Sequence, residues 1–87
     1  MTVKQQIRAI LDEHAKLATG IDSVGDADDL YAAGMTSHAS VTVMLACEDE
    51  WDIEFPQQML KKSTFGSVDA IAAALAELGL TDESVAS

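Results

Sequence analysis

The sequence predicts an all-α fold, a bundle of three main helices and one short helix, with a long loop between the first two main helices. Apolar residues recur at helical spacing in three segments, and no segment shows the alternation that is typical of a β-strand. Alanine, the strongest helix former, supplies 14 of the 87 residues. At this length we expect one domain over residues 1–80, with residues 81–87 as a frayed tail.

The first helix is expected over residues 3–18. Thr2 can cap its start, and its apolar positions recur every three or four residues. Residues 19–36 then form an 18-residue segment rich in Gly, Asp and Ser. A loop of this length in so small a domain is typical of functional segments. We expect Leu30 and Tyr31 to anchor it to the core.

The second helix is expected to begin at Ser37 and to end near Asp52. Successive residues lie about 100° apart around a helix, which separates two faces. One face is expected to point inward: Ser40, Val43, Met44, Cys47 and Trp51. The other is expected to point away from the core: His38, Val41, Leu45, Asp49 and Asp52. This outward face is either a set of ordinary surface residues or a docking surface for a partner.

The last third of the chain predicts two further helices. A short helix is expected over residues 57–62, with Met59 and Leu60 as its apolar contacts. Ser67 can cap the last helix, and Gly79 suits the position just past its end. The apolar stripe of this helix consists of Val68, Ile71, Ala72, Leu75 and Leu78.

Charge is distributed unevenly along the chain. It has 15 acidic and 5 basic residues, a net charge of −10, which argues against a protein that binds nucleic acid or an anionic membrane, because phosphates would be repelled. Between Lys16 and Lys61 there is no basic residue, and nine acidic ones occur there: Asp22, Asp26, Asp28, Asp29, Glu48, Asp49, Glu50, Asp52 and Glu54. The pattern either serves solubility or marks a docking surface for basic partners. With no long apolar run and no signal-peptide pattern, we expect a cytoplasmic protein. We also expect a monomer.

The sequence gives little support to a catalytic or a metal-binding function. Ser37 and His38 are neighbours at a helix start, where adjacent side chains do not face each other, and no acid is expected to orient His38. The acidic loop does not fit a calcium-binding EF-hand, because Tyr31 falls at the glycine position and Ser37 at the bidentate glutamate position. The single cysteine, Cys47, excludes a cysteine-cluster metal site and is expected to be a core thiol.

Local chemistry suggests two roles for Ser37. A serine at this point is expected to cap the second helix. A phosphodiester on the same serine would lie at a helix N-terminus, where free N–H groups and the helix dipole stabilise an anion.

Residues 30–56 carry a family resemblance. They contain Leu30-Tyr31-Ala32-Ala33-Gly34-Met35-Thr36-Ser37, then Val41, Met44, Glu48-Asp49-Glu50-Trp51, Ile53 and Pro56. These residues resemble the loop, the modification site, the acidic helix end and the proline exit of the acyl carrier protein family. Residues 63–68 resemble the approach to that family's last helix. In that family the serine that matches Ser37 carries 4′-phosphopantetheine, whose thiol holds the cargo as a thioester.

The resemblance implies a non-catalytic carrier that presents an acyl or aminoacyl group to partner enzymes. Its implied partners are a phosphopantetheinyl transferase, an acyl- or aminoacyl-loading ligase and downstream enzymes with basic docking surfaces. The implied docking residues are Thr36, His38, Val41, Leu45, Glu48, Asp49 and Asp52. The rival interpretation is an unmodified acidic helical adaptor that binds a protein partner through the second helix.

Two positions depart from the family pattern. The family's usual Asp before the serine is Thr36 here, and its usual Leu after the serine is His38. The His38 change puts service with ordinary fatty-acid synthase enzymes in doubt. The chain looks closer to specialised bacterial carriers, among them small carriers that accept amino acids from stand-alone synthetase-like ligases.

Overall fold

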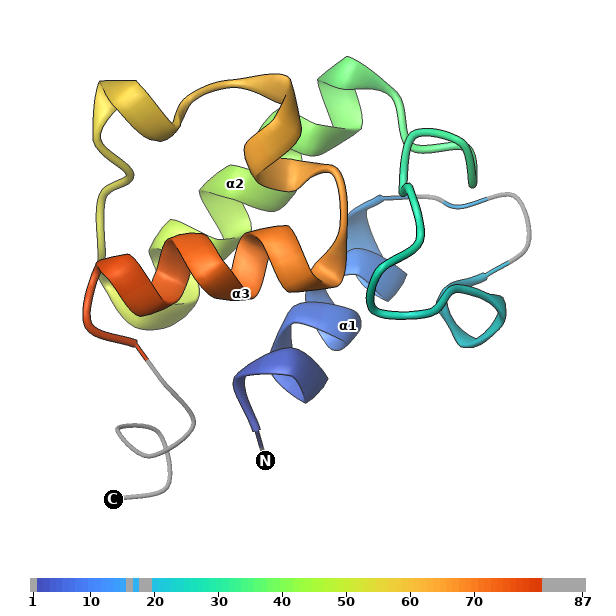
Figure 1. The fold of residues 1–87 in the computed structure, drawn as a ribbon, viewed down its shortest axis with the longest axis horizontal. Coiled ribbons are helices and arrows are strands. Elements are labelled where there is room, and N and C mark those ends of the chain that lie inside the picture. Colours follow the sequence, from blue (N-terminus) through green and yellow to red (C-terminus); the bar gives the residue numbers. More distant parts are fainter. Residues whose placement is uncertain (1, 16, 18–19, 81–87) are drawn as a thin grey trace.

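The structure, a computed structural model, describes residues 2–15, 17 and 20–80. These residues contain three α-helices, three short 3₁₀ turns and no strand, in the order α1 (Val3–His14), η1 (Ile21–Ser23), α2 (Ser37–Trp51), η2 (Gln57–Met59), η3 (Lys62–Phe65) and α3 (Val68–Glu77). α1 packs against both α2 and α3, and η3 also contacts both of these helices (Figure 1). The all-α prediction is confirmed.

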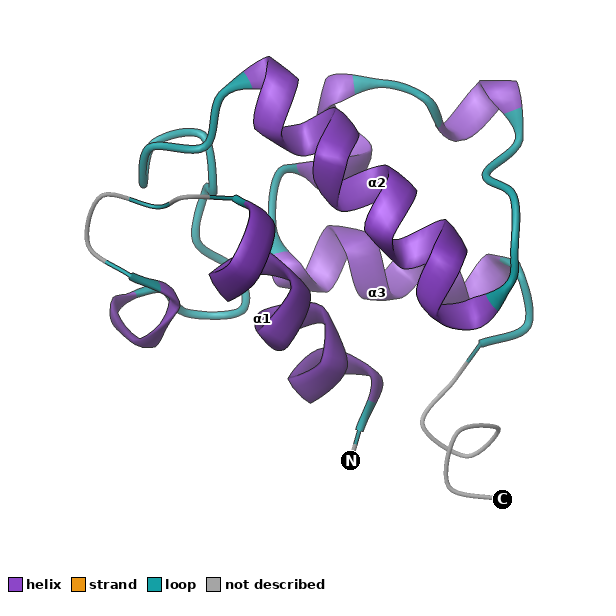
Figure 2. Cartoon of the chain, turned by 180° about the vertical axis from the view of Figure 1, so that it is seen from behind, coloured by secondary structure: helices purple, strands orange, loops and turns teal. Residues whose placement is uncertain are grey.

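Figure 2 shows the same arrangement from behind, with α2 running along the side of the molecule opposite α3. α2 begins where the long loop ends and finishes where the η2–η3 segment begins. None of the helices in the described part is long and apolar enough to cross a membrane.

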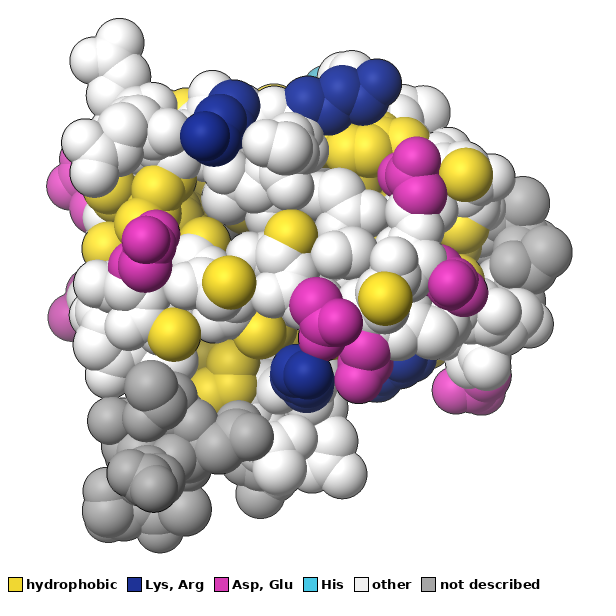
Figure 3. All heavy atoms as spheres, in the orientation of Figure 1, with side chains coloured by type: hydrophobic (Ala, Val, Ile, Leu, Met, Phe, Trp, Pro, Cys, Tyr) yellow, Lys and Arg dark blue, Asp and Glu magenta, His cyan; other side chains and the backbone are white. Residues whose placement is uncertain are grey.

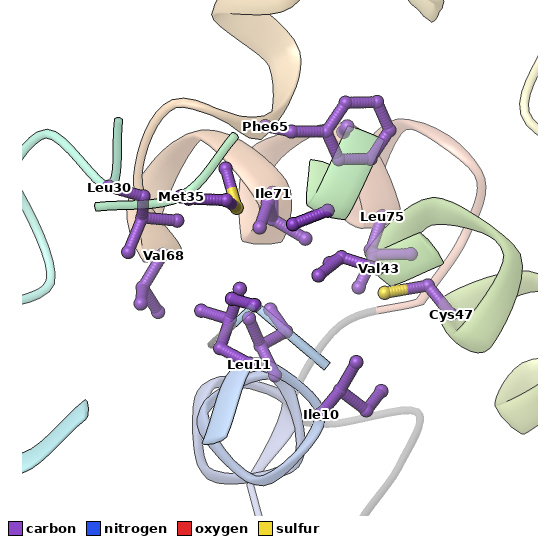
Figure 4. Packing of buried hydrophobic residues seen from close by; sticks show 14 of the residues in the cluster. Ile10, Leu11, Leu30, Met35, Val43, Cys47, Phe65, Val68, Ile71 and Leu75 are labelled. Atoms are coloured by element: carbon purple, nitrogen blue, oxygen red, sulfur yellow. The ribbon is translucent and has the colours of Figure 1, made fainter. Parts of the chain in front are cut away.

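The core is made of side chains from all three helices, the long loop and η3 (Figure 4). Its largest fully buried side chains are Ile7, Leu11, Leu30, Val43, Cys47, Val68, Ile71 and Leu75. On α2 the predicted inward face is confirmed at Val43 and Cys47, and Ala39 joins them. The remaining residues predicted for that face are half-buried: Ser40, Met44 and Trp51.

α1 is shorter than predicted. Thr2 caps its start in a capping box, but the helix ends at His14 and does not continue to residue 18. The Arg8 guanidinium donates to the carbonyls of Ile21 and Val24 at 3.1 and 2.8 Å, and both of these residues are buried. These hydrogen bonds hold Ile21 and Val24 beside α1. Residues 16, 18 and 19 lie outside the described residues.

The short helix predicted over residues 57–62 is wrong in extent. Only the 3₁₀ turn η2 forms in its first half, and the separate turn η3 follows it. Met59 is buried as predicted, but Leu60 is 49% exposed, so its predicted core contact is wrong.

Aromatic packing explains why a second turn forms. Phe65 packs edge to face against Phe55, with ring centroids 5.4 Å apart, and both rings are buried. The Tyr31 hydroxyl donates to the Lys62 carbonyl at 3.1 Å. These contacts tie η3 to the exit of α2 and to the long loop, so the chain bends after Met59 and cannot extend one helix.

α3 matches its prediction closely. Ser67 caps it by accepting the Ala70 N–H at 3.0 Å. Gly79 has φ = 92°, and the Leu80 N–H returns to the Leu75 carbonyl at 2.8 Å, which together make a Schellman ending. Val68, Ile71 and Leu75 are buried as predicted, Ala74 is buried in addition, and the predicted Ala72 and Leu78 are half-buried. The predicted frayed tail, residues 81–87, lies outside the described residues.

Candidate functional site

A tight turn over residues 30–35 sets the position of Ser37. Leu30 and Met35, at its two ends, are 0% and 2% exposed, and the Met35 N–H donates to the Leu30 carbonyl at 3.0 Å. Gly34 lies between them with φ = 117°, a region that favours glycine. Because both ends are buried, the chain leaves this turn at a defined point and enters α2.

The first half of the loop is held by charged groups. The Arg8 Nε and Nη2 donate to Asp26 Oδ1 at 3.0 and 2.7 Å. The Lys4 Nζ lies 2.8 Å from Asp69 Oδ1 and 3.9 Å from Asp26 Oδ2. The Asp69 N–H also donates to the Asp26 carbonyl at 2.9 Å. This network, referred to below as the Asp26 cluster, joins the loop to α1 and α3.

Thr36, and not Ser37, caps α2. The Thr36 hydroxyl accepts the Ala39 N–H at 3.0 Å, and the Thr36 carbonyl accepts the Ser40 N–H at 2.9 Å. The predicted capping role of Ser37 is therefore wrong. Thr36 has extended backbone angles, φ −85° and ψ 165°, which aim its hydroxyl back at the helix end, whereas Ser37 is already the first helical residue.

The Ser37 side chain is exposed and free of this structural task. The Ser40 hydroxyl donates to the Ser37 carbonyl at 2.7 Å, but among the described residues no side chain hydrogen-bonds the Ser37 hydroxyl. The N–H groups of Ser37 and His38 belong to the first turn, where a helix offers no internal acceptor. An anion attached to Ser37 would therefore be stabilised by these groups and by the helix dipole.

The residues predicted for the outward face are all exposed: His38, Val41, Leu45 and Asp49 on α2, and Asp52 at its C-cap. Val41 and Leu45 expose 50% and 54% of their surface. They share a face with Ser37 and His38 because residues four apart lie one helical turn from each other. The site therefore combines an available hydroxyl with an apolar strip that begins one turn away.

Two of the predicted docking residues also have bonds within the molecule. The Glu48 Oε2 accepts the Phe55 N–H at 2.9 Å, and the Glu48 carbonyl accepts the Ile53 N–H at 3.0 Å, so Glu48 holds the exit of α2. Thr36 uses its hydroxyl as the helix cap. By contrast, Asp49 and Asp52 are exposed and take part in no ion pair within the described residues.

Several hollows border α2 in the described part of the chain, and two of them are lined by residues of its first half. One, of about 240 Å³, lies between α2 and the η2–η3 segment, and its lining includes Tyr31, Val41, Leu60, Lys61 and Lys62. The other, of about 270 Å³, lies between the end of α1 and the start of α2, and its lining includes Glu13, His14, Thr36 and His38.

Leu60, Lys61 and Lys62 were missed as site residues by the sequence reasoning. The sequence did contain a signal for the two lysines, since they are adjacent and directly follow the acid-only stretch. What the sequence did not show is that Leu60 points outward and reaches the same hollow as Val41.

Cys47 is a buried core thiol, as predicted, with 0% exposure. Burial, with smaller contributions from the charges of Glu48 and Glu50, raises the pKa of the Cys47 thiol to about 12. Near neutral pH it is protonated and inaccessible, and the protonated form is a poor nucleophile. A thioester on this chain would therefore need a thiol other than that of Cys47.

Comparison with known proteins identifies close relatives. No family model matches the chain. It is 48% identical over 65 residues to the aminoacyl carrier protein of Agrobacterium fabrum, which covers 75% of this chain and 78% of that protein.

Solved structures give the same result. The chain resembles the carrier protein from Agrobacterium tumefaciens in the crystal structure of its complex with an engineered Bradyrhizobium japonicum glycine:[carrier protein] ligase and AMP. The TM-score is 0.82 at 42% identity, covering 84% of this chain and 97% of that one. It also resembles the glycylated carrier protein bound to the Bradyrhizobium japonicum ligase, with a TM-score of 0.72 at 26% identity, over 83% of this chain and 96% of that one.

Proposed function

This chain belongs to the aminoacyl carrier protein family, and we propose that it holds an amino acid as a thioester on a 4′-phosphopantetheine arm attached to Ser37. The choice of Ser37 rests on one observation: the two neighbouring hydroxyls at the start of α2 have different roles. Thr36 caps the helix, which leaves the neighbouring Ser37 hydroxyl exposed and without a structural role.

The residues around Ser37 fit such an arm. Its phosphodiester would lie against the unpaired N–H groups of Ser37 and His38 at the positive end of the helix dipole. The arm supplies a terminal thiol for the thioester. The chain itself provides no alternative, because Cys47 is 0% exposed and its thiol pKa is raised to about 12.

The partner that loads the cargo is proposed to be an amino acid:[carrier protein] ligase. Support comes from the relatives, which are carrier proteins in complex with a glycine:[carrier protein] ligase, one of them glycylated. Before loading, a phosphopantetheinyl transferase would attach the arm. The carrier itself supplies position and recognition, and the chemical steps take place in the partner enzymes.

The outward face of α2 is proposed to dock these enzymes. The shape of the contact would come from His38, next to Ser37, and from Val41 and Leu45, about one and two turns further along α2. Asp49 and Asp52 would pair with basic residues of the partner. Exposed charge pairs of this kind raise the association rate and select partners more than they raise affinity, which suits a carrier that must release each enzyme.

The test is the intact mass of the protein after incubation with coenzyme A and a phosphopantetheinyl transferase. The wild type should gain the mass of one phosphopantetheine group, and Ser37→Ala should gain none. Ser40→Ala is the matched control, because Ser40 lies one turn further along α2, is half-buried and donates its hydroxyl to the Ser37 carbonyl. A modified Ser37→Ala together with an unmodified Ser40→Ala would place the arm elsewhere. A wild type that gains no mass would favour an unmodified adaptor.

Thermal or chemical unfolding of the same variants separates attachment from folding. Ser37→Ala should leave the free energy of unfolding almost unchanged. Thr36→Ala should lower it by about 1 kcal/mol, because it removes the cap that accepts the Ala39 N–H. The reverse order of effects would contradict the assignment of the two hydroxyls.

A further inference from the structure

The proposed function does not use Lys61 and Lys62, which form a basic edge beside the outward face of α2. Lys61 and Lys62 line the hollow of about 240 Å³ together with Val41 and Leu60. We infer that the carrier docks its loading ligase through a bipolar surface. The ligase would present carboxylates to Lys61 and Lys62, and an apolar side chain to the hollow between these lysines and α2. This inference rests on the proposed function, in which a ligase loads the chain.

The apolar part of this surface is continuous with the outward face of α2. Within the described residues the large hydrophobic side chains that are strongly exposed are Val41, Leu45 and Leu60, at 50%, 54% and 49%. Val41 and Leu60 come from different segments and line the same hollow, with Tyr31 and Phe65 also in its lining. A side chain inserted there by a partner would cover two of the three exposed apolar residues at once.

The charges of Lys61 and Lys62 are available to a partner. Among the described basic residues, Lys4 and Arg8 pair with carboxylates of the Asp26 cluster. Lys61 and Lys62 are exposed and form no ion pair with a described residue, and the Lys62 Nζ lies 4.8 Å from the centre of the Tyr31 ring. In Figure 3, basic side chains lie along the upper edge of the molecule, where Figure 1 places the η2–η3 segment. A second basic group lies lower, beside acidic side chains.

Charge complementarity defines the partner. A ligase with a uniformly basic docking surface would meet Asp49 and Asp52 favourably but would place like charges opposite Lys61 and Lys62. Like-charge contacts across an interface are costly and reject wrong partners. A ligase surface with basic residues opposite the end of α2 and with Asp or Glu opposite Lys61 and Lys62 would be complementary to both charged parts of the carrier. The lysine pair therefore selects among enzymes that the acidic charge alone would all attract.

The test uses one change of charge for which a simply basic partner and a bipolar partner predict opposite effects on binding. Lys61→Gln with Lys62→Gln makes the carrier more acidic, which should strengthen binding if the partner is simply basic. On a bipolar surface the same variant should slow association and weaken binding by roughly fivefold, since two exposed pairs are lost. The matched control is Ala9→Glu with Ala76→Glu, which changes the net charge by the same amount at exposed positions of α1 and α3. The control should bind at least as fast as the parent.

The probe is the engineered Bradyrhizobium japonicum glycine:[carrier protein] ligase, which binds a carrier 42% identical to this chain. Association and dissociation rates are measured by surface plasmon resonance. All variants carry Ser37→Ala, so that docking is read without the arm. Unchanged or faster association of the lysine variant would overturn the bipolar surface, as would a parent that does not bind the ligase. Neither result affects the mass experiment on Ser37, and a failed mass gain would leave this binding result intact.

Discussion

Two segments of this chain are rich in acidic residues, and their carboxylates differ in the bonds that they form. In residues 22–29, Asp26 accepts two hydrogen bonds from Arg8, and the Asp28 and Asp29 carboxylates accept the N–H groups of Gly25 and Tyr31. In residues 48–54, the exposed Asp49, Glu50 and Asp52 form no ion pair with a described residue.

The difference shows that charge density in a sequence does not by itself mark a docking surface. The carboxylates of the loop form hydrogen bonds within the molecule. These bonds hold the conformation of the loop and therefore the position of Ser37. Those at the end of α2 remain available to a partner, with the exception of Glu48, which holds Phe55. The loop acids therefore bear mainly on folding, and the exposed α2 acids are the ones that we propose for recognition.

The largest effect that tests this comparison is on stability. Asp26→Ala should lower the free energy of unfolding by about 1–2 kcal/mol, because Arg8 loses a partly buried charged acceptor. Asp49→Ala should change it by less than about 0.5 kcal/mol. Urea unfolding of both variants measures the difference. Equal losses of stability would remove the distinction between the two segments.

The next effect is on docking and depends on salt. Raising the ionic strength shortens the screening length to roughly 8 Å at physiological salt and less above it, so association with the ligase should slow, by roughly fivefold from low to high salt. Dissociation should change less. In Asp49→Ala the salt dependence should be smaller than in the wild type, whereas conservative Asp26→Asn should retain it. Association rates that do not depend on salt would mean that the α2 acids only keep the protein soluble.

The smallest effect concerns His38, which lies on the same outward face of α2. It is exposed beside Ser37 and lines the hollow that also contains Glu13 and His14. His38→Leu should leave arm attachment at Ser37 intact and lower loading by the ligase by roughly threefold, the equivalent of one exposed hydrogen bond. Acceptance by general fatty-acid enzymes should rise. Loading rates with both enzyme types decide the question, and identical rates would make His38 an ordinary surface residue.

Much of this protein follows from local sequence patterns. Helical periodicity placed α2 and α3, the cap at Ser67 and the glycine at 79 gave the ends of α3, and the helical wheel separated Val43 and Cys47 from Val41 and Leu45. These predictions succeed because they depend on repeats of three and four residues and on turn chemistry within a few positions. Comparison with relatives confirmed the family that the residues around Ser37 had suggested.

Tertiary structure decided what depends on residues far apart in the chain. It chose Thr36 over Ser37 as the cap, because the buried turn between Leu30 and Met35 fixes which residue enters the helix first. It also turned Leu60 outward and brought it to Val41, because the packing of Phe65 on Phe55 bends the intervening segment. Which acids pair internally was settled in the same way, since Arg8 and Asp26 are 18 residues apart and meet because the loop packs beside α1. Local patterns fix local backbone geometry, but the partner of a charged or apolar side chain depends on how the segments pack.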